Sequence, residues 1–253
     1  MLLLIDIGNT RTHVGLADIQ RVHARESLPT RQWAEGAAAD QLRSWVGTTH
    51  LEGAVVASVV PHVTGQVQLA LQRHWGIDPL QLHAGTVRGL VIDYPRPETI
   101  GADRLANAIA ARHHFGAPVV VVDFGTAVTF DIVDGRGCYV GGVIAPGLAA
   151  MTDYLHERTA LLPRVQLRSC EQVVGRSTEE AMLAGAWYGY PGLVEAIVRE
   201  IQGQLGVPHL RVVATGGDAA LLAGRLRLIE TVCPDLTLEG LRLTWLAHHV
   251  SGD

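Results

Sequence analysis

Residues 3–12 read LLIDIGNTRT, and residues 121–129 repeat the same design as VVDFGTAVT. Each stretch is an apolar run, then Asp-x-Gly followed by Asn or Thr, then a second run of strand-forming residues. The pattern predicts a strand, a tight turn carrying a carboxylate, and a returning strand. Two such turns facing each other are suited to hold a nucleotide, because glycine lets the backbone approach phosphate and Asp orders a hydrated cation. The repeat also predicts two related halves around one cleft.

Composition narrows the class of protein. Of the 253 residues, 48% are hydrophobic and 18% are charged, and the formal net charge is −5. This apolar share supplies a core for one large or two small domains and argues against extensive disorder. No basic tract stands out, so we expect no nucleic-acid partner. No apolar run reaches membrane-spanning length, so we expect no membrane association.

The chain contains no lysine, since all 20 Lys or Arg positions are arginine. A phosphate loop of the GxxxxGK(S/T) type and a Schiff-base lysine are therefore excluded. Any phosphate must be held by arginine, backbone N–H groups, hydroxyls or metal. The cysteines are Cys138, Cys170 and Cys233, whose spacing indicates neither a zinc site nor a disulfide framework. The apolar N-terminus lacks a basic region and reaches Asp6 at once, which predicts a strand rather than a signal peptide. We therefore expect a cytoplasmic protein.

Alternating strand-like and helix-like segments predict an α/β fold. A boundary near residue 117 divides it into an N-terminal domain, 1–117, and a C-terminal domain, 118–253. Ser177 and Glu180 match a capping box at the start of a long helix. The expected strands include 2–7, 12–17, 53–61, 119–122 and 210–214, and the expected helices include 31–46, 63–75, 101–115 and 178–202.

Residues 97–104 read PETIGADR, which resembles the PxxxGxDR motif of type III pantothenate kinases. The turn at Asp6 resembles the first phosphate loop of the actin-like ATPase and sugar kinase superfamily. Further stretches that resemble the family or superfamily are 57–61 (ASVVP), 123–127 (DFGTA), 137–148 (GCYVGGVIAPGL) and 215–217 (TGG), the last at the adenosine-side glycine turn. The motifs follow in order from residue 2 to about residue 217, which makes the combination specific.

The resemblance implies an α/β fold of two ribonuclease-H-like (actin-like ATPase) domains around a central cleft. It implies ATP-dependent phosphorylation of pantothenate to 4′-phosphopantothenate, the first step of coenzyme A biosynthesis. It also implies a homodimer with pantothenate near the interface between subunits. A divalent cation such as Mg²⁺ and a monovalent cation, K⁺ or NH₄⁺, are the implied cofactors.

Asp103 is the residue that we expect to act as the general base. A primary alcohol is a poor nucleophile, and a nearby carboxylate can accept its proton as the new bond forms. Asp103 follows Gly101 in the first turn of an expected helix, beside Arg104. The local pattern alone fits equally well a carboxylate that caps the helix and pairs with Arg104. The resemblance favours the catalytic role.

The turn after the first strand is expected to hold the ATP phosphates, and Asp6 to order magnesium directly or through water. Thr126 is expected to donate its hydroxyl to the phosphates from the second turn. The alternatives are an ordinary Asx-type hairpin turn and a plain strand threonine. The repeat at Asp123 favours the phosphate role. The implied ATP-binding residues are Asp6, Ile7, Gly8, Asn9, Thr10, Arg11, Thr12, His13 and Thr126.

Asp123 is the implied ligand of the monovalent cation, which would offset phosphate charge in a chain without lysine; its alternative is a structural turn left by duplication. Arg104 offers a fork of donors for a carboxylate or the transferring phosphate, although most arginines are solvated. Tyr94 is implied to contact the substrate, and its alternative is a loop tyrosine that packs on the surface. Thr178 is implied to reach the site of a neighbouring subunit, and its alternative is a residue that starts a helix. The implied pantothenate-binding residues are Tyr94, Gly101, Ala102, Asp103, Arg104 and Thr178.

Two other functions remain open at this stage. A kinase for another small alcohol would keep the ATP turns but change the segment from Tyr94 to Arg104. A regulatory, non-catalytic relative would need none of the catalytic residues. The residues at the motif positions favour pantothenate kinase over both.

Overall fold

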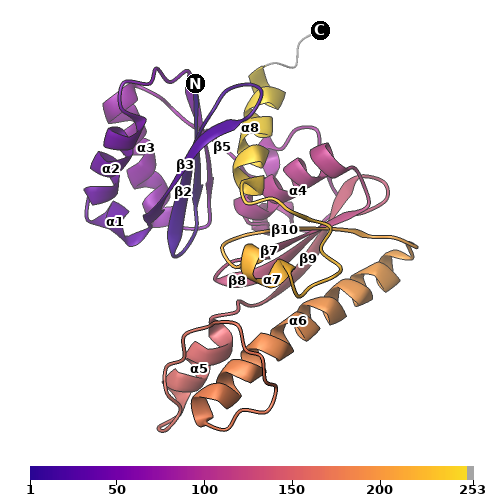
Figure 1. Ribbon diagram of the computed structural model, residues 1–253. Coiled ribbons are helices and arrows are strands. Elements are labelled where there is room, and N and C mark those ends of the chain that lie inside the picture. Colours follow the sequence, from indigo (N-terminus) through magenta and orange to yellow (C-terminus); the bar gives the residue numbers. More distant parts are fainter. Residues whose placement is uncertain (250–253) are drawn as a thin grey trace. The chain divides into compact units, whose positions relative to one another are not determined.

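The computed structural model describes residues 1–249, and Figure 1 shows its elements. The chain forms two compact units. Unit 1 contains Met1–Gly116, Gly135–Val140 and residues 235–249, and unit 2 contains Ala117–Asp134 and Gly141–Pro234. The first division lies beside the expected boundary. However, two later segments return to unit 1, so the units differ from two contiguous segments, 1–117 and 118–253.

Unit 1 is built on a five-stranded mixed sheet with the order β3-β2-β1-β4-β5. β1 pairs antiparallel with β2 and parallel with β4, and the outer pairs are β2 with β3 (antiparallel) and β4 with β5 (parallel). The strands are β1 (Leu2–Ile7), β2 (Arg11–Ala17), β3 (Val22–Pro29), β4 (Gly53–Ser58) and β5 (Leu80–Gln81).

Helices cover both faces of this sheet, as Figure 1 shows for α1–α3 on one side and α8 on the other. Leu3, Ile5 and Ile7 of β1 join the core beneath α1 (Arg31–Ala34), α2 (Ala37–Val46) and α3 (Pro61–Trp75). Because side chains alternate along a strand, the other residues of β1 face the opposite way. There α8 (Leu236–His249) contacts β1 and β4, and α4 (Ala102–Phe115) contacts β4. Asp6 therefore lies at the end of β1 on the face that carries α4.

The second sheet is also mixed and has the order β11-β10-β7-β8-β9-β6. β7 pairs antiparallel with β8 and parallel with β10, which repeats the arrangement of β1 with β2 and β4. This confirms the α/β class and the repeated strand–turn–strand unit. The strands are β6 (Val91–Ile92), β7 (Val119–Phe124), β8 (Ala127–Val133), β9 (Cys138–Pro146), β10 (Arg211–Thr215) and β11 (Thr231–Val232); β6 and the first residues of β9 belong to unit 1.

The long helix α6 (Thr178–Leu205) packs Tyr190, Val194 and Val198 into the core of unit 2. Its cap differs from the expected capping box. Ser177 Oγ accepts from the N–H of Glu180 at 3.2 Å, but Glu180 Oε2 accepts from the N–H of Arg176 at 2.7 Å rather than from Ser177. The shorter helices of unit 2 are α5 (Ala150–Arg158) and α7 (Ala219–Ala223).

Two other expectations need correction. The single helix expected over residues 31–46 is two helices, because Gly36 adopts φ 78° between α1 and α2. The strand β3 was not expected from the sequence; it lies at the edge of the sheet and is mostly exposed, so it shows no apolar alternation. Among the described helices, none combines the length and apolar character needed to cross a membrane.

Candidate active site

The turn between β1 and β2 is closed and braced by backbone hydrogen bonds. Gly8 donates its N–H to the carbonyl of Arg11 at 3.0 Å. Thr30, which follows β3, donates its hydroxyl to the Gly8 carbonyl at 2.7 Å and its N–H to the Thr10 carbonyl at 3.1 Å. Asn9 and Thr10 are exposed at the tip. A ligand at this turn therefore meets a backbone that is already fixed.

Two residues of the expected ATP-binding set point away from the turn surface. Ile7 and Thr12 are fully buried. The Ile7 side chain belongs to the core, and the Thr12 hydroxyl lies 3.1 Å from the Thr30 hydroxyl and accepts from Trp33 Nε1 at 3.2 Å. These two side chains support the turn from inside, and contact of residues 7 and 12 with ATP stays a prediction.

Arg11 and His13 lie on the face of β2 that carries Asp6, because His13 pairs with Asp6 across the two strands. Arg11 is held by Ser27, donating Nε to its hydroxyl at 2.8 Å and Nη2 to its carbonyl at 2.7 Å. Partial burial lowers the pKa of His13, and the charges of Arg11 and Arg25 lower it further. At neutral pH this patch therefore combines a fixed guanidinium with an uncharged imidazole.

Asp103 lies in the first turn of α4, where burial raises the pKa of its carboxyl. Its Oδ1 accepts from the backbone N–H of Arg104 at 2.8 Å, and this bond and the Arg104 charge act in the opposite direction on the pKa. A Cβ at Gly101 would lie 2.5 Å from Oδ1, so a larger residue there would force the carboxylate out of its present position. Ala102 beside it is buried.

Val59 connects this helix start with the Asp6 turn within unit 1. It donates its N–H to the Ile7 carbonyl at 3.1 Å. Its side chain lies 3.4 Å from the Cβ position of Gly101. The chain after β4 thus joins the end of β1 to the first residues of α4. Sequence reasoning noticed the stretch 57–61 but assigned no role to Val59.

Tyr94 is 37% exposed and contacts the buried Tyr139 edge to face, with ring centroids 6.4 Å apart. Its neighbour Asp93 accepts from Arg136 at 2.6 Å and donates its N–H to the Tyr139 carbonyl at 2.9 Å. These contacts anchor the start of the loop that leads to residues 97–104. Tyr94 is therefore placed by the fold, with part of its ring accessible.

In unit 2 the Asp123 turn is braced by two later segments. Gly125 donates to the Ala127 carbonyl at 3.1 Å, and Gly147 donates to the Thr126 carbonyl at 3.2 Å. Gly216, at φ 92°, packs so closely that a Cβ there would lie 2.5 Å from Asp123 Oδ1. The expected glycine turn at 215–217 therefore lies directly against the Asp123 turn.

Asp218 is a site candidate that sequence reasoning missed. Its N–H donates to the Phe124 carbonyl at 3.2 Å, so it belongs to the brace of the Asp123 turn. Burial raises the pKa of its carboxyl. The available signal was its position directly after the TGG stretch.

Thr178 is separate from these contacts. It is the exposed first residue of α6, and Ser177 rather than Thr178 caps the helix. The contacts within unit 2 therefore do not explain the pantothenate-binding role expected for Thr178.

Asp6 and Asp123 are suited to cations that take most of their ligands from phosphate oxygens and water. Within residues 1–249, no group of three or more His, Cys, Asp or Glu side chains gathers as a metal site. Mg²⁺ at phosphates needs one or two carboxylates and completes its shell with water and phosphate oxygens. Asp6 and Asp123 are half-buried, and each lies one residue before the end of its strand, β1 and β7. Each position fits a carboxylate that supplies one ligand to a bound cation.

Comparison with known proteins assigns the family. The family model described as type III pantothenate kinase matches residues 2–200. This chain belongs to the type III pantothenate kinase family. The match includes Asp6, Asp103 and Asp123, and it ends before the 215–218 turn.

Relatives carry the same family name along nearly their whole length. A type III pantothenate kinase from Akkermansia muciniphila is 48% identical over 243 residues, covering 95% of this chain and 96% of the relative. Another from Myxococcus xanthus is 40% identical over 259 residues, covering 99% of this chain and 100% of the relative.

Solved structures with low sequence identity to this chain share its fold, and the comparison with them supports the fold only. A protein from Campylobacter jejuni described as a Baf family transcriptional activator aligns with a TM-score of 0.64 and 20% identity, covering 99% of this chain and 100% of that chain. The activator of 2-hydroxyisocaproyl-CoA dehydratase from Clostridium difficile, with bound ADPNP, aligns with a TM-score of 0.54 and 12% identity, covering 98% and 96%.

Proposed function

We propose that this chain transfers the γ-phosphoryl group of ATP to pantothenate, giving 4′-phosphopantothenate and ADP at the first step of coenzyme A biosynthesis. The observation that carries the proposal is Asp103: a carboxylate whose pKa is raised by burial, at a helix start that carries the family's PxxxGxDR motif. A base of raised pKa takes up an alcohol proton more readily than an ordinary Asp.

The proposed step uses Asp103 as the general base. Its carboxylate takes the proton of the primary hydroxyl of pantothenate while that oxygen forms a bond to the γ-phosphorus. The bond from the γ-phosphorus to the bridging oxygen breaks, and ADP leaves with the electron pair. Phosphoryl transfer asks a protein mainly for positioning and charge stabilisation. The hydrogen bond from Arg104 N–H to Oδ1 orients the carboxylate for this purpose.

Pantothenate would be held around the start of α4. Gly101 and Ala102 allow close approach to the backbone, and Arg104 offers a guanidinium to the substrate carboxylate or to the transferring phosphate. Tyr94 would contact the substrate through its accessible ring. Thr178 would reach the site of a neighbouring subunit, a role that only a dimer can provide.

The phosphates of ATP would lie on the Asp6 turn, against Gly8, Asn9, Thr10, Arg11 and His13. In unit 2, Thr126 would donate its hydroxyl to phosphate, and Asp123 would bind K⁺ or NH₄⁺. Mg²⁺, held through Asp6 directly or by water, would neutralise phosphate charge when bound. The fixed guanidinium of Arg11 supports this assignment, since the chain has no lysine to do the same.

A homodimer is part of the proposal. Several large apolar side chains are exposed in one part of unit 2; Tyr154 is 61%, Leu161 90% and Val174 79% exposed. Exposed apolar groups of this kind favour a partner surface. We also propose that the enzyme acts in the cytoplasm.

The test is an ADP-release assay with ATP and magnesium, run with and without pantothenate, and with K⁺ or Na⁺ as the sole monovalent cation. We expect turnover that requires pantothenate and is faster with K⁺. Equal rates in the two salts would contradict the cation role of Asp123. Turnover with another alcohol but not pantothenate would favour the other small-molecule kinase, and no turnover with any alcohol would favour the regulatory relative.

A further inference from the structure

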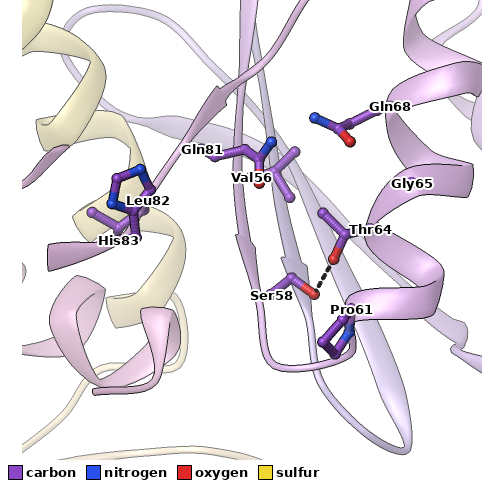
Figure 2. Close-up of a pocket in the computed structure, with 9 residues that line it drawn as sticks. All are labelled: Val56, Ser58, Pro61, Thr64, Gly65, Gln68, Gln81, Leu82 and His83. Atoms are coloured by element: carbon purple, nitrogen blue, oxygen red, sulfur yellow. Dashed lines mark hydrogen bonds between the residues drawn. The ribbon is translucent and has the colours of Figure 1, made fainter. Parts of the chain in front are cut away.

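The loop 82–101 joins β5 to α4 and carries the tyrosine expected to contact the substrate. Its two ends are fixed within unit 1. Figure 2 shows His83 where the chain leaves β5. Thr86 then donates its hydroxyl to the Gln81 carbonyl at 2.8 Å. At the far end the short 3-10 helix Pro97–Thr99 leads into α4. The position of the tyrosine therefore depends on what holds the middle of the loop.

The middle of the loop is held by residues 135–140, a segment from the second half of the chain that belongs to unit 1. There β6 pairs in parallel with Cys138 and Tyr139 at the start of β9. Asp93 donates its N–H to the Tyr139 carbonyl at 2.9 Å, and Tyr94 is the next residue. The hairpin of β8 and β9 thus brings to unit 1 the segment on which the loop rests.

Tyr139 contacts Tyr94 through its ring as well. The Tyr139 side chain is fully buried, whereas Tyr94 is 37% exposed. The ring centroids lie 6.4 Å apart and the ring planes meet at 62°, which is the edge-to-face geometry that aromatic pairs favour. A buried ring is held by close packing on all sides. It therefore limits the orientations that the partly exposed ring of Tyr94 can take.

The other contacts of the loop act less directly on this ring. Arg136 and Asp93 form an ion pair at 2.6 Å, but their side chains are 65% and 58% exposed. Ion pairs in such exposed positions contribute little, because water and salt screen them. Arg112 of α4 donates to the carbonyl of Gly89, which precedes Tyr94 by several residues. The Tyr139 ring is thus the contact that bears on the orientation of Tyr94.

We propose that Tyr139 is a positioning residue for pantothenate, which it never touches, because it orients Tyr94 before the substrate arrives. The inference rests on the proposed function, in which Tyr94 contacts pantothenate. A side chain that is ordered in advance loses less conformational entropy when a ligand binds. Tyr139 therefore lowers the KM for pantothenate. The KM for ATP should not depend on it, because the proposed phosphate turns belong to other segments.

The first test is the ADP-release assay on variants of Tyr139. Tyr139→Leu removes the ring, and we expect the KM for pantothenate to rise about three- to tenfold, while kcat and the KM for ATP change less than about twofold. Tyr139→Phe keeps the ring and should restore the natural KM. Tyr139→Met is a second variant without the ring, because methionine fills irregular core space if the leucine variant fails to fold.

A double-mutant cycle shows whether Tyr139 acts through Tyr94. Tyr94→Ala alone should raise the KM for pantothenate, and adding Tyr139→Leu should raise it no further, because the ring to be oriented is gone. Leu42→Ala is the matched control: Leu42 is also fully buried in unit 1, in a core cluster that does not include Tyr139. This control should lower Tm and leave the KM unchanged. Additive effects in the cycle, an unchanged KM in a folded variant without the ring, or an equal rise in Leu42→Ala would overturn the proposal.

Fluorine NMR of the full chain labelled with fluorotyrosine gives a readout that does not need activity. The chain has five tyrosines, and the Tyr94 signal is the one missing from Tyr94→Phe. We expect Tyr139→Leu to shift the Tyr94 signal and Leu42→Ala to leave it in place. A Tyr94 signal that does not move in Tyr139→Leu would refute the positioning contact alone. Absence of turnover with pantothenate in the natural chain would instead refute the proposed function, and with it the substrate role of Tyr139.

Discussion

Replacing Asp103 with Asn removes the proposed base while keeping the local geometry. An amide oxygen can accept the Arg104 N–H that now bonds Oδ1 at 2.8 Å, so the start of α4 should be unchanged. Asn cannot take up the alcohol proton. General-base catalysis contributes roughly 10²–10⁴-fold in rate. We therefore expect kcat to fall at least about 100-fold, which corresponds to about 2.7 kcal/mol in the barrier.

The same substitution makes a prediction about stability. Burial raises the pKa of Asp103 in the folded chain above the ordinary value of 3.8. The folded state then holds its proton more tightly than the unfolded state, so stability is lost as pH rises from 3.8 through the folded pKa. The asparagine side chain does not titrate, so the variant has no such loss. We expect Asp103→Asn to be at least as stable as the natural chain at pH 7. Below the ordinary pKa of Asp, where the natural carboxyl is also uncharged, the variant should gain no stability from the missing charge.

The assay pairs ADP release at saturating ATP and pantothenate with thermal unfolding followed across pH. Asp40→Asn is the matched control, because Asp40 also lies in the first turn of a helix but is exposed and pairs only loosely with Arg43 at 3.6 Å. It should keep full activity. A near-normal kcat for Asp103→Asn would refute the base assignment. Lost activity accompanied by a lower Tm at pH 7 would show instead that Asp103 is structural.

Three further substitutions test the fold around the site. Gly216→Ala should destabilise by several kcal/mol, because an L residue at φ 92° is strained by about 1–3 kcal/mol and its Cβ would lie 2.5 Å from Asp123 Oδ1; an unchanged Tm and an unchanged response to K⁺ would contradict this. Thr12→Val should cost about 1–3 kcal/mol in urea unfolding by leaving Trp33 Nε1 without its buried acceptor, and a neutral effect would show that the pair is unimportant. Gly240→Ala should exceed about 3 kcal/mol, since its Cβ would lie 2.0 Å from a carbonyl of α4; a calorimetric Tm near that of the natural chain would exclude such close packing.

The strongly buried elements were predictable from the sequence. β1 and β7 are continuous apolar runs whose residues are almost all buried, so the pattern and the fold agree. β3 was missed for the converse reason: as an exposed edge strand it needs no apolar face. Two-residue strands such as β5 are too short to leave any periodic signal.

The site residues divide in the same way. The strand–turn–strand repeat identifies Asp6 and Asp123, because Asp, Gly and Asn or Thr in sequence define a turn locally. The burial of the Thr12 side chain was predictable, because Thr12 is two residues before the buried Val14 and residues two apart in a strand share a face. Val59 and Asp218 lie in or beside stretches that the sequence analysis singled out, but their bracing roles depend on contacts with segments distant in the sequence.

The two turns show what sequence repetition preserves. Each keeps its own closing bond, Gly8 N–H to Arg11 in one and Gly125 N–H to Ala127 in the other. Their braces also come from corresponding parts. Thr30 after β3 and Gly147 after β9 donate N–H groups to the two turns, and Val59 after β4 and Asp218 after β10 donate to the carbonyls of Ile7 and Phe124. A hairpin is encoded by neighbouring residues, so duplication leaves it visible. A brace is encoded far along the chain and follows the elements that pack there. The repeat therefore extends from the motif to its supporting segments, and the two turns differ in the side chains that these segments bring: Thr30 and Val59 at the first turn, Gly147 and Asp218 at the second.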